Sequence, residues 1–222
     1  RYSPLTFVPL VLLHEFSKLT TLYFALICFI SFFPSVSPIG PGTSFVGLLF
    51  ILVTTLIREG YEEYQRHHRD NLENGLWYDH ITGDAHLPIR SEDIVVGDLL
   101  YIHCDQKFPC DVVLLSSAHT GGQVYVETTQ LDGETSLKRR AVLHATKEAS
   151  AHEWMDLHGR VEAEPPHQDM FAFRGTAYLE HGPGDELAHS LTAAMFVPRG
   201  AFLRNTEWCV AMAVYVGPHT KS

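Results

Sequence analysis

The feature that most constrains the fold is a long uncharged stretch near the beginning of the chain. No Asp, Glu, Lys or Arg occurs between Lys18 and Arg58, an interval of 39 residues in a chain of 222. A helix that crosses a bilayer needs about 20 apolar residues. The interval therefore has room for two membrane passes joined by a short turn, and it predicts a two-helix transmembrane hairpin.

The turn between the two passes is predicted from its prolines and glycines. The segment PSVSPIGPGT, Pro34–Thr43, holds three Pro and two Gly, which end helices and allow the chain to reverse. The apolar runs on either side, Leu19–Phe33 and Ser44–Ile57, are short for a bilayer, so flanking residues must complete the spans. We therefore predict passes over about 19–36 and 39–57.

The positions of Lys and Arg predict the orientation of this hairpin. Arg1 and Lys18 flank one end, and Arg58, Arg66 and Arg69 flank the other, whereas the connecting turn has no cation. Positively charged residues favour the cytosolic side of a membrane. We therefore expect both ends of the hairpin, and the domain that follows it, to be cytosolic.

A charged stretch follows the second pass. In Arg58–Asn71, REGYEEYQRHHRDN, Glu62 stands four residues before Arg66, a spacing that supports a helix. The second pass is therefore expected to continue as a helical stalk. The first domain, with the membrane-entry segment, the hairpin and the stalk, is predicted over residues 1–71.

Short apolar runs separated by turn residues predict a mainly β domain over residues 72–222. The clearest runs are HLPIR, DIVVGDLLYIH, FPCDVVLLSS and GGQVYVETTQ. A short helix is expected around Ala149–Leu157 and a loop over Glu180–Ser190, while Glu207–Val216 fits a buried strand or a buried helix equally well. The predicted fold class is mixed: a two-helix transmembrane hairpin with a helical stalk, followed by a mainly β domain.

Composition excludes several classes of function. The net charge is −10, and nucleic-acid binding needs a cationic surface, so no nucleic-acid partner is expected. The four Cys form no C-x-x-C pair and the 14 His show no metal-ligand spacing. We expect the Cys to be buried apolar side chains in a reducing compartment. No glycine-rich nucleotide-binding motif is present.

One loop has a composition that points to chemistry. In Tyr125–Arg140, YVETTQLDGETSLKRR, an Asp132-Gly133 pair is followed at once by Glu134 and then by a cluster of cations. Asp-Gly is a common turn signal, and polar residues are usual in loops, so an ordinary exposed turn is one interpretation. The other is that the loop presents Glu134 to a reacting group outside this sequence.

Several segments carry a resemblance to a known family. They are RYSPLTFVPLVLLHEFSKLTTLYF, REGYEEYQRHHRDN, VGDLLYI, FPCDVVLLSS, YVETTQLDGETSLK, VEAEPPHQDMFAFRG, LRNTEW and VGPHTK. In this order the chain resembles the N-terminal part of the P-type ATPases, and within them the type IV branch, the phospholipid-translocating ATPases or lipid flippases. The resemblance implies that the β domain is the actuator domain, ending before a third membrane helix.

The resemblance implies a catalytic role for the loop. In such pumps ATP phosphorylates an aspartate in a separate domain, and the actuator loop then promotes hydrolysis of the acyl phosphate. Glu134 is the expected catalytic residue, since a carboxylate within reach of a water can orient it and accept its proton. Gly133 would allow close approach to the phosphate, and Asp132 and Thr135 would set the turn and contact neighbouring domains.

The resemblance also implies a substrate, cofactors and partners. We expect transport of a phospholipid, specifically an aminophospholipid, from the outer to the cytosolic leaflet, with Ser31, Phe32 and Pro34 on the substrate path near the outer end of the first pass. Mg²⁺ and ATP are implied for the whole protein, with no cofactor or metal bound by this part. A small two-span accessory subunit is a further implied partner.

Departures from the family pattern leave two alternatives open. Ser136 replaces a usual Asn, Cys110 replaces a usual Ala, and Ser31-Phe32 stands where some flippases have a polar Gln. The sequence has no Asp-Lys-Thr-Gly-Thr phosphorylation motif, so the phosphorylated aspartate must lie in a domain outside it. The alternatives are a cation-transporting P-type ATPase, against which Asp132 and LRNTEW count, and a catalytically inactive membrane-anchored β module.

Overall fold

The computed structural model of the chain describes residues 6–33, 37, 40–83, 85–147, 158–166, 169–170, 172–182 and 185–221. The chain divides into two compact units, Arg1–Leu72 and Glu73–Ser222. Helices make up the first unit and mostly antiparallel strands the second. The predicted mixed fold class is confirmed.

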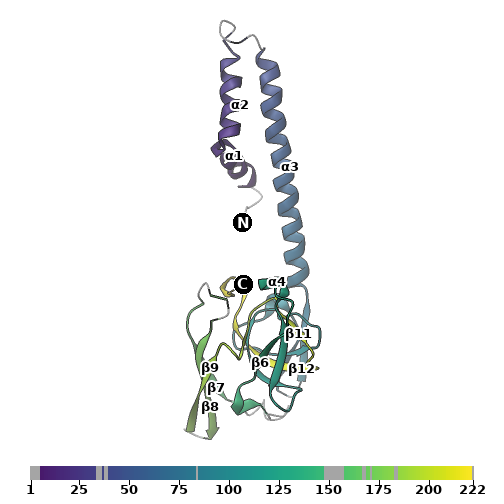
Figure 1. Cartoon of the computed structure of the whole chain (residues 1–222), viewed down its shortest axis with the longest axis vertical. Coiled ribbons are helices and arrows are strands. Elements are labelled where there is room, and N and C mark those ends of the chain that lie inside the picture. Colours follow the sequence, from purple (N-terminus) through teal and green to yellow (C-terminus); the bar gives the residue numbers. More distant parts are fainter. Residues whose placement is uncertain are drawn as a thin grey trace. The chain divides into compact units, whose positions relative to one another are not determined.

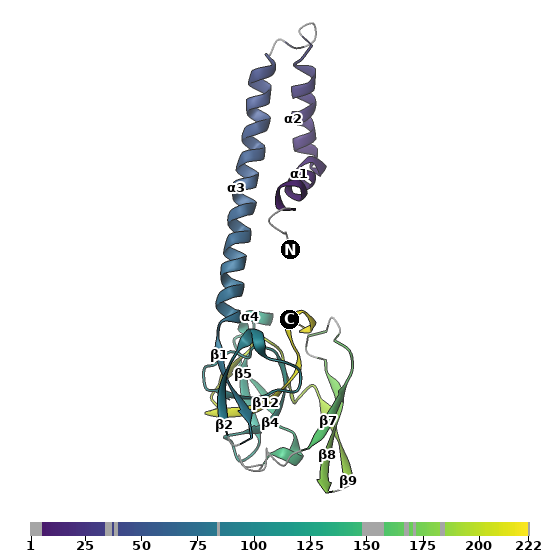
Figure 2. The same ribbon diagram turned by 180° about the vertical axis from the view of Figure 1, so that it is seen from behind.

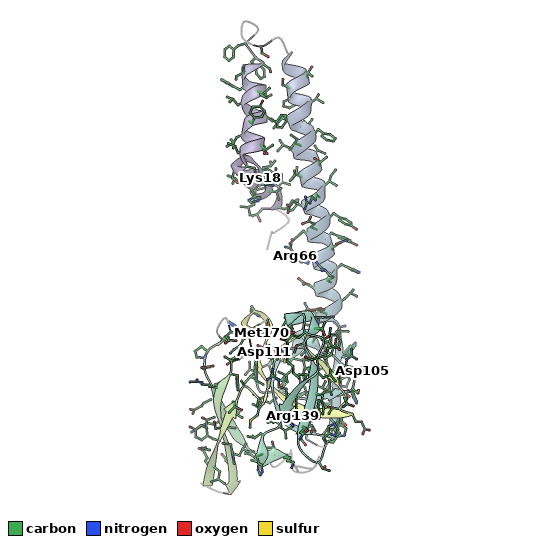
Figure 3. The ribbon with its side chains drawn as sticks, viewed as in Figure 1. Lys18, Arg66, Asp105, Asp111, Arg139 and Met170 are labelled. Carbon is green, nitrogen blue, oxygen red and sulfur yellow. The ribbon has the colours of Figure 1, made fainter. Side chains whose placement is uncertain are left out.

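The first unit consists of three helices, α1 (Phe7–Ser17), α2 (Leu19–Ile30) and most of α3 (Pro41–Asn74). The axes of α1 and α2 meet at 87° around Lys18, which has extended backbone and is labelled at this bend in Figure 3. Beyond the bend, α2 runs alongside α3 in both views (Figures 1 and 2). One helix, Gly42–Asn74, is long and apolar enough to cross a membrane, and the bent pair α1 and α2 forms a second candidate span.

The first predicted pass differs from the helix that forms. Over 19–36 the prediction is too long, because α2 has 12 residues and ends at Ile30. At 1.5 Å per residue it is about 18 Å long, short of a hydrocarbon core of about 30 Å. Pro34 has no N–H to bond the carbonyl of Ile30, so the sequence itself stops the helix here. Residues 34–36 lie outside the described residues.

The stalk helix forms, with different ion pairs and a later end than predicted. Glu62 pairs with Arg58, Nε to Oε1 2.9 Å, and Arg66 pairs with Glu63, Nη1 to Oε2 3.0 Å. The predicted Glu62–Arg66 pair is therefore replaced by two others, which keep the helical spacings of four and three residues. The helix continues three residues past the predicted Asn71.

The second unit is built on three antiparallel sheets. The largest has the strand order β10-β4-β12-β3-β1-β2; in chain order its strands are β1 (Trp77–Thr82), β2 (Ala85–Arg90), β3 (Leu99–His103), β4 (Asp111–Ser117), β10 (Phe196–Val197) and β12 (Trp208–Tyr215). A second sheet has the order β11-β5-β6, with β5 (Gln123–Glu127), β6 (Lys138–Ala141) and β11 (Phe202–Arg204).

The third sheet, in the order β7-β8-β9, contains β7 (Gly159–Ala163), β8 (Arg174–Gly182) and β9 (Asp185–Thr192). In Figure 1 it lies on one side of the unit, with β11 and β12 on the other, and Figure 2 shows β1 and β2 also on that other side. Short helical turns are α4 (Thr129–Asp132) and three 3₁₀ segments, Ser91–Asp93, His144–Thr146 and Gly217–His219.

The core of the second unit lies between the first two sheets. Every residue of β4 is buried, and the side chains that pack with it into one cluster include the fully buried Leu100, Ile102, Leu114, Val124, Val126 and Leu203. Burial of one such side chain contributes about 1.5–3 kcal/mol. Because Val124 and Val126 are buried in this core, β5 is fixed, and it positions the residues that follow Glu127.

The C-terminal segment is tied to the same core. The buried Asp111 carboxylate accepts the backbone N–H of Arg199 and that of Lys221, each at 2.7 Å. In both views α4 and the C-terminal end of the chain lie at the same end of the second unit (Figures 1 and 2).

Three local predictions are resolved by the structure. The ambiguous segment Glu207–Val216 is a strand, β12. The loop predicted over Glu180–Ser190 is wrong, because these residues belong to the β8–β9 hairpin. The run DIVVGDLLYIH is only partly strand, since Val95 and Val96 precede β3 and are exposed. The predicted helix around Ala149–Leu157 lies outside the described residues.

The cysteine prediction is correct for three residues and wrong for one. All four Cys are free thiols, of which Cys28, Cys110 and Cys209 are buried. Cys104 is exposed, because it follows the last residue of β3 in the turn that leads to Asp105.

Candidate functional site

The loop that contains Glu134 begins where β5 leaves its sheet. Thr128 is fully buried, and the next four residues form the single helical turn α4, which ends at Gly133. Gly133 has φ 76° and ψ 0°, a left-handed conformation that glycine adopts without steric cost. The Asp-Gly pair thus closes a helical turn in place of the expected β-turn, and Glu134 follows directly.

Asp132 organises this loop through both carboxylate oxygens. Oδ1 accepts the backbone N–H of Glu134 at 2.9 Å, while Oδ2 accepts the hydroxyl of Thr128 at 2.8 Å and lies 2.5 Å from Nζ of Lys138. The pKa of Asp132 falls to about 2, first because of the hydrogen bond from Lys138 and next because of the N–H of Glu134. Asp132 is therefore ionised at neutral pH.

The peptide groups of Glu134 are held on both sides. Its N–H donates to Asp132, and its carbonyl accepts the hydroxyl of Thr129 at 3.1 Å. Its carboxylate, by contrast, is 61% exposed and forms an ion pair with Lys138, Oε2 to Nζ, at 3.1 Å. The backbone is fixed while the acid faces outward. This is the arrangement expected of a side chain that acts on a group outside the loop.

The other residues predicted for this loop lie beside Glu134. Thr135 is exposed. Sequence reasoning missed Thr128 and Lys138, which both bond Oδ2 of Asp132. The spacing of four residues between Glu134 and Lys138 could have indicated the role of Lys138. No sequence pattern indicates that Thr128 is buried.

The predicted substrate-path residues lie in the first unit, apart from the loop. Ser31 is buried, and its hydroxyl donates to the carbonyl of Ile27 and bonds the hydroxyl of Ser44, both at 2.8 Å. Ser31 therefore joins the beginning of α3 to the end of α2. The side chain of Phe32 is exposed, and Pro34 lies outside the described residues.

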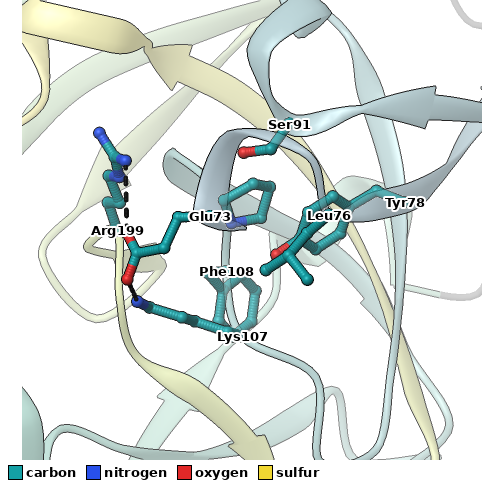
Figure 4. Close-up of a pocket in the computed structure, with 8 residues that line it drawn as sticks. Glu73, Leu76, Tyr78, Ser91, Lys107, Phe108 and Arg199 are labelled. Carbon is teal, nitrogen blue, oxygen red and sulfur yellow. Dashed lines mark hydrogen bonds and ion pairs between the residues drawn. The ribbon is translucent and has the colours of Figure 1, made fainter. Parts of the chain in front are cut away.

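A second polar cluster lies at the start of the second unit, where α3 ends. Glu73 accepts Nζ of Lys107 at 2.6 Å and lies 3.7 Å from Nη2 of Arg199. Figure 4 shows the two cations on the same carboxylate, beside a small hollow that Tyr78 and Phe108 help to line. These ion pairs fix the first residue of the second unit to the rest of that unit. The sequence pattern did not predict them.

Metal binding by the described residues is not supported by their arrangement. Over the described ranges no three His, Cys, Asp or Glu side chains are placed to hold a metal ion.

Comparison with known proteins identifies relatives over the whole chain. Residues 1–45 match the family described as phospholipid-translocating ATPase N-terminal. The full chain is 35% identical over 222 residues to "Phospholipid-transporting ATPase IG" of Homo sapiens, covering 20% of that protein. It is 33% identical over 225 residues to "Phospholipid-transporting ATPase VA" of Homo sapiens, covering 15%, and 31% identical over 226 residues to "Phospholipid-transporting ATPase 1" of Arabidopsis thaliana, covering 19%.

Each alignment includes 100% of this chain. The predicted resemblance to the phospholipid-translocating P-type ATPases is confirmed. The chain spans only 15–20% of the length of these three relatives.

Proposed function

We propose that the chain is the N-terminal part of an ATP-driven phospholipid flippase, in which residues 1–71 supply the membrane entry, the hairpin and the stalk, and residues 72–222 form a cytosolic actuator domain. Such an enzyme would move phospholipid, specifically an aminophospholipid, from the outer to the cytosolic leaflet. The similarity of the whole chain to phospholipid-transporting ATPases supports the class of activity.

One observation carries the catalytic part of this proposal. Glu134 presents an exposed carboxylate from a loop whose peptide groups are bonded on both sides. Catalysis by positioning needs a group that does not have to be reorganised as the reaction proceeds. The loop supplies such a group, and its carboxylate is accessible to a reaction partner from another domain.

The mechanism assigned to the loop is hydrolysis of an aspartyl phosphate in a domain outside this sequence. A water attacks phosphorus in line with the bond to the aspartate, and the Glu134 carboxylate orients that water and accepts its proton. The P–O bond to the aspartate breaks and releases phosphate and the free carboxylate. ATP, bound elsewhere with Mg²⁺, supplies the phosphoryl group.

The neighbours of Glu134 have supporting roles in this mechanism. A Cβ built on Gly133 would project into open space. Because glycine has no Cβ, that space stays free for the phosphate. Asp132 fixes the Glu134 peptide. Thr135, which is exposed, contacts the neighbouring domain. Lys138 pairs with the carboxylates of Asp132 and Glu134. Because the Glu134 side chain is 61% exposed, its ion pair with Lys138 opens at little cost when the loop docks.

In the first unit we propose that the helices cross the membrane as a hairpin, with both ends cytosolic and with Phe32 and Pro34 near the lipid path. We propose the same path for Ser31, whose hydroxyl bonds Ile27 and Ser44 within the helices. A small accessory subunit with two spans is a further proposed partner.

The test uses the full-length protein and the variant Glu134→Gln. The phosphoenzyme should form at the wild-type rate and decay about 100-fold more slowly, because the amide cannot accept the proton of the water. A pulse-chase with labelled ATP measures both rates. A wild-type decay rate in this variant would refute the assignment of Glu134.

The substrate class needs a separate measurement. ATPase activity of the full-length protein in detergent should rise on addition of an aminophospholipid. Stimulation by K⁺ or Ca²⁺ without any response to phospholipid would instead support a cation pump.

A further inference from the structure

The segment LRNTEW, Leu203–Trp208, contacts the strand that leads to the Glu134 loop. Arg204 donates from Nε to Oε2 of Glu127 at 2.7 Å, and Nη1 bonds the carboxylate of Asp105. Its guanidinium also lies 5.3 Å from the ring centre of Phe202. Glu127 is the last residue of β5, two positions before α4 begins.

The two residues after Arg204 secure the same strand. The hydroxyl of Thr206 accepts the backbone N–H of Tyr125 at 3.1 Å, and Asn205 has a left-handed backbone with φ 45°. Asp105, on the other side of Arg204, is also left-handed, with φ 66°. Strained non-glycine residues of this kind persist only where their surroundings enforce them, and they are often found near functional sites.

Thr129 connects this cluster to Glu134. Its hydroxyl donates to the carbonyl of Glu134 at 3.1 Å. Arg204 and, to a smaller extent, a hydrogen bond from Thr129 lower the pKa of the Glu127 carboxyl, so that carboxylate is a second acceptor for the hydroxyl. A hydroxyl has a single proton, so it donates to one of these acceptors at a time. The Glu127 carboxylate is a stronger acceptor than a carbonyl because it is charged.

Arg204 bears on this competition because it bonds the Glu127 carboxylate. With Arg204 in place, the charge of Glu127 is neutralised and Oε2 is already bonded. Without it, an unpaired carboxylate would compete for the Thr129 hydroxyl and release the carbonyl of Glu134. We propose that Arg204 is a positioning residue for the Glu134 loop, acting through Glu127 and Thr129; this rests on the function proposed above.

The experiment compares four variants of the full-length protein: Arg204→Gln, Glu127→Gln, the double variant, and Glu134→Gln as reference. Phosphoenzyme formation and decay are both measured. Arg204→Gln should slow decay about 10-fold or more with little change in formation, as expected when a catalytic group is misplaced. Glu127→Gln in the same protein should restore most of the decay rate, because removal of the competing charge returns the hydroxyl to Glu134.

A matched control is available on another sheet. Arg90 also pairs with a carboxylate, Glu92, and also lies 5.3 Å from the centre of an aromatic ring, Trp77. Arg90→Gln should leave both rates unchanged. If Arg204→Gln prevents folding, Thr129→Val and Thr129→Ser take its place: the first should slow decay and the second should not, since only serine retains the hydroxyl.

The outcomes separate this inference from the proposed function. Normal decay in Arg204→Gln or Thr129→Val, beside slow decay in Glu134→Gln, overturns the role of Arg204 and leaves the function standing. Slow decay in Arg204→Gln that Glu127→Gln does not relieve also overturns it. Normal decay in Glu134→Gln refutes the proposed function itself.

Discussion

Asp132 holds Glu134 by its backbone: Oδ1 of Asp132 accepts the N–H of Glu134 at 2.9 Å. The same carboxylate is held in turn by Thr128 and Lys138. The outward-facing acid, Glu134, is thus oriented by an inward-facing acid, Asp132, and the two carboxylates have different roles.

The first prediction concerns Asp132→Asn. The amide can keep the acceptor for the Glu134 N–H, but it loses the charge that binds Lys138, so the loop is less well fixed. In the full-length protein, phosphoenzyme decay should slow by about 10-fold, less than in Glu134→Gln, with formation unchanged. Asp93→Asn, at an exposed position in the 3₁₀ segment, is the control; an equal effect at that position would show that the change is unspecific.

The second prediction contrasts two glycines. Gly133 has φ 76° with open space around it, whereas a Cβ on Gly159 would lie 2.4 Å from the carbonyl oxygen of Tyr178. Gly133→Ala should therefore cost about 1–3 kcal/mol from backbone strain alone and leave the fold intact. Gly159→Ala should disrupt the pairing of β7 with β8.

Thermal unfolding of both glycine variants, with phosphoenzyme decay of the first, tests this contrast. A folded Gly133→Ala protein with slower decay is the expected result, because the loop would change conformation to relieve the strain. Wild-type stability in Gly159→Ala would contradict the close contact between β7 and β8.

How much of this fold could be predicted from the sequence depends on how each element is stabilised. The run FPCDVVLLSS forms the wholly buried β4, because a continuous apolar run with flanking turn residues fits a central strand. The β8–β9 hairpin was missed because its strands are polar and partly exposed: Glu180 pairs with Glu186 across it, and Leu187 is 45% exposed. Its buried face is short, with Ala177, Leu179 and Leu191 separated by polar residues, and so few positions give only a weak alternating pattern.

The same distinction applies to the site. Glu134 and its three neighbours were predicted from a short local motif, and they lie at and after the end of α4. The turn type was wrong, because the helical turn is stabilised by a bond from the buried Thr128 to Asp132. Arg204 and Glu127 are 77 residues apart in the chain, and only the pairing of β11 with β5 brings them together.

The third prediction is that Glu73–Ser222 folds without the first unit. All three sheets lie within these residues, as do the cluster between the first two sheets and a second hydrophobic cluster that includes Phe173, Leu191 and Phe196. A chain of this size buries enough surface for independent stability. Urea unfolding should be a single cooperative transition, with far-UV circular dichroism and tryptophan fluorescence coinciding. Separate transitions for the two signals would show that the domain needs its helices.

The fourth prediction concerns how the stability of that segment depends on pH, because two aspartates shift in opposite directions. The pKa of Asp132 is lowered to about 2 by Lys138. Its contribution is therefore complete above the unfolded pKa of about 3.9 and is lost as the pH falls toward 2. Burial raises the pKa of Asp111 above its ordinary value, so its contribution is complete below the unfolded pKa and declines as the pH rises through the folded value.

Substitution separates the two contributions. In Asp132→Asn the loss of stability between pH 4 and pH 2 should be smaller than in the wild type. Asp111→Asn should be less stable throughout, since an amide has one oxygen to accept the two N–H groups of Arg199 and Lys221, and a buried donor without a partner costs about 1–3 kcal/mol. The stability difference between the wild type and Asp111→Asn should narrow as the pH rises above about 4. Urea unfolding at a series of pH values measures both effects. If the stability difference between the wild type and Asp111→Asn instead widens as the pH rises, the pKa of Asp111 is lowered. The two N–H groups would then outweigh burial.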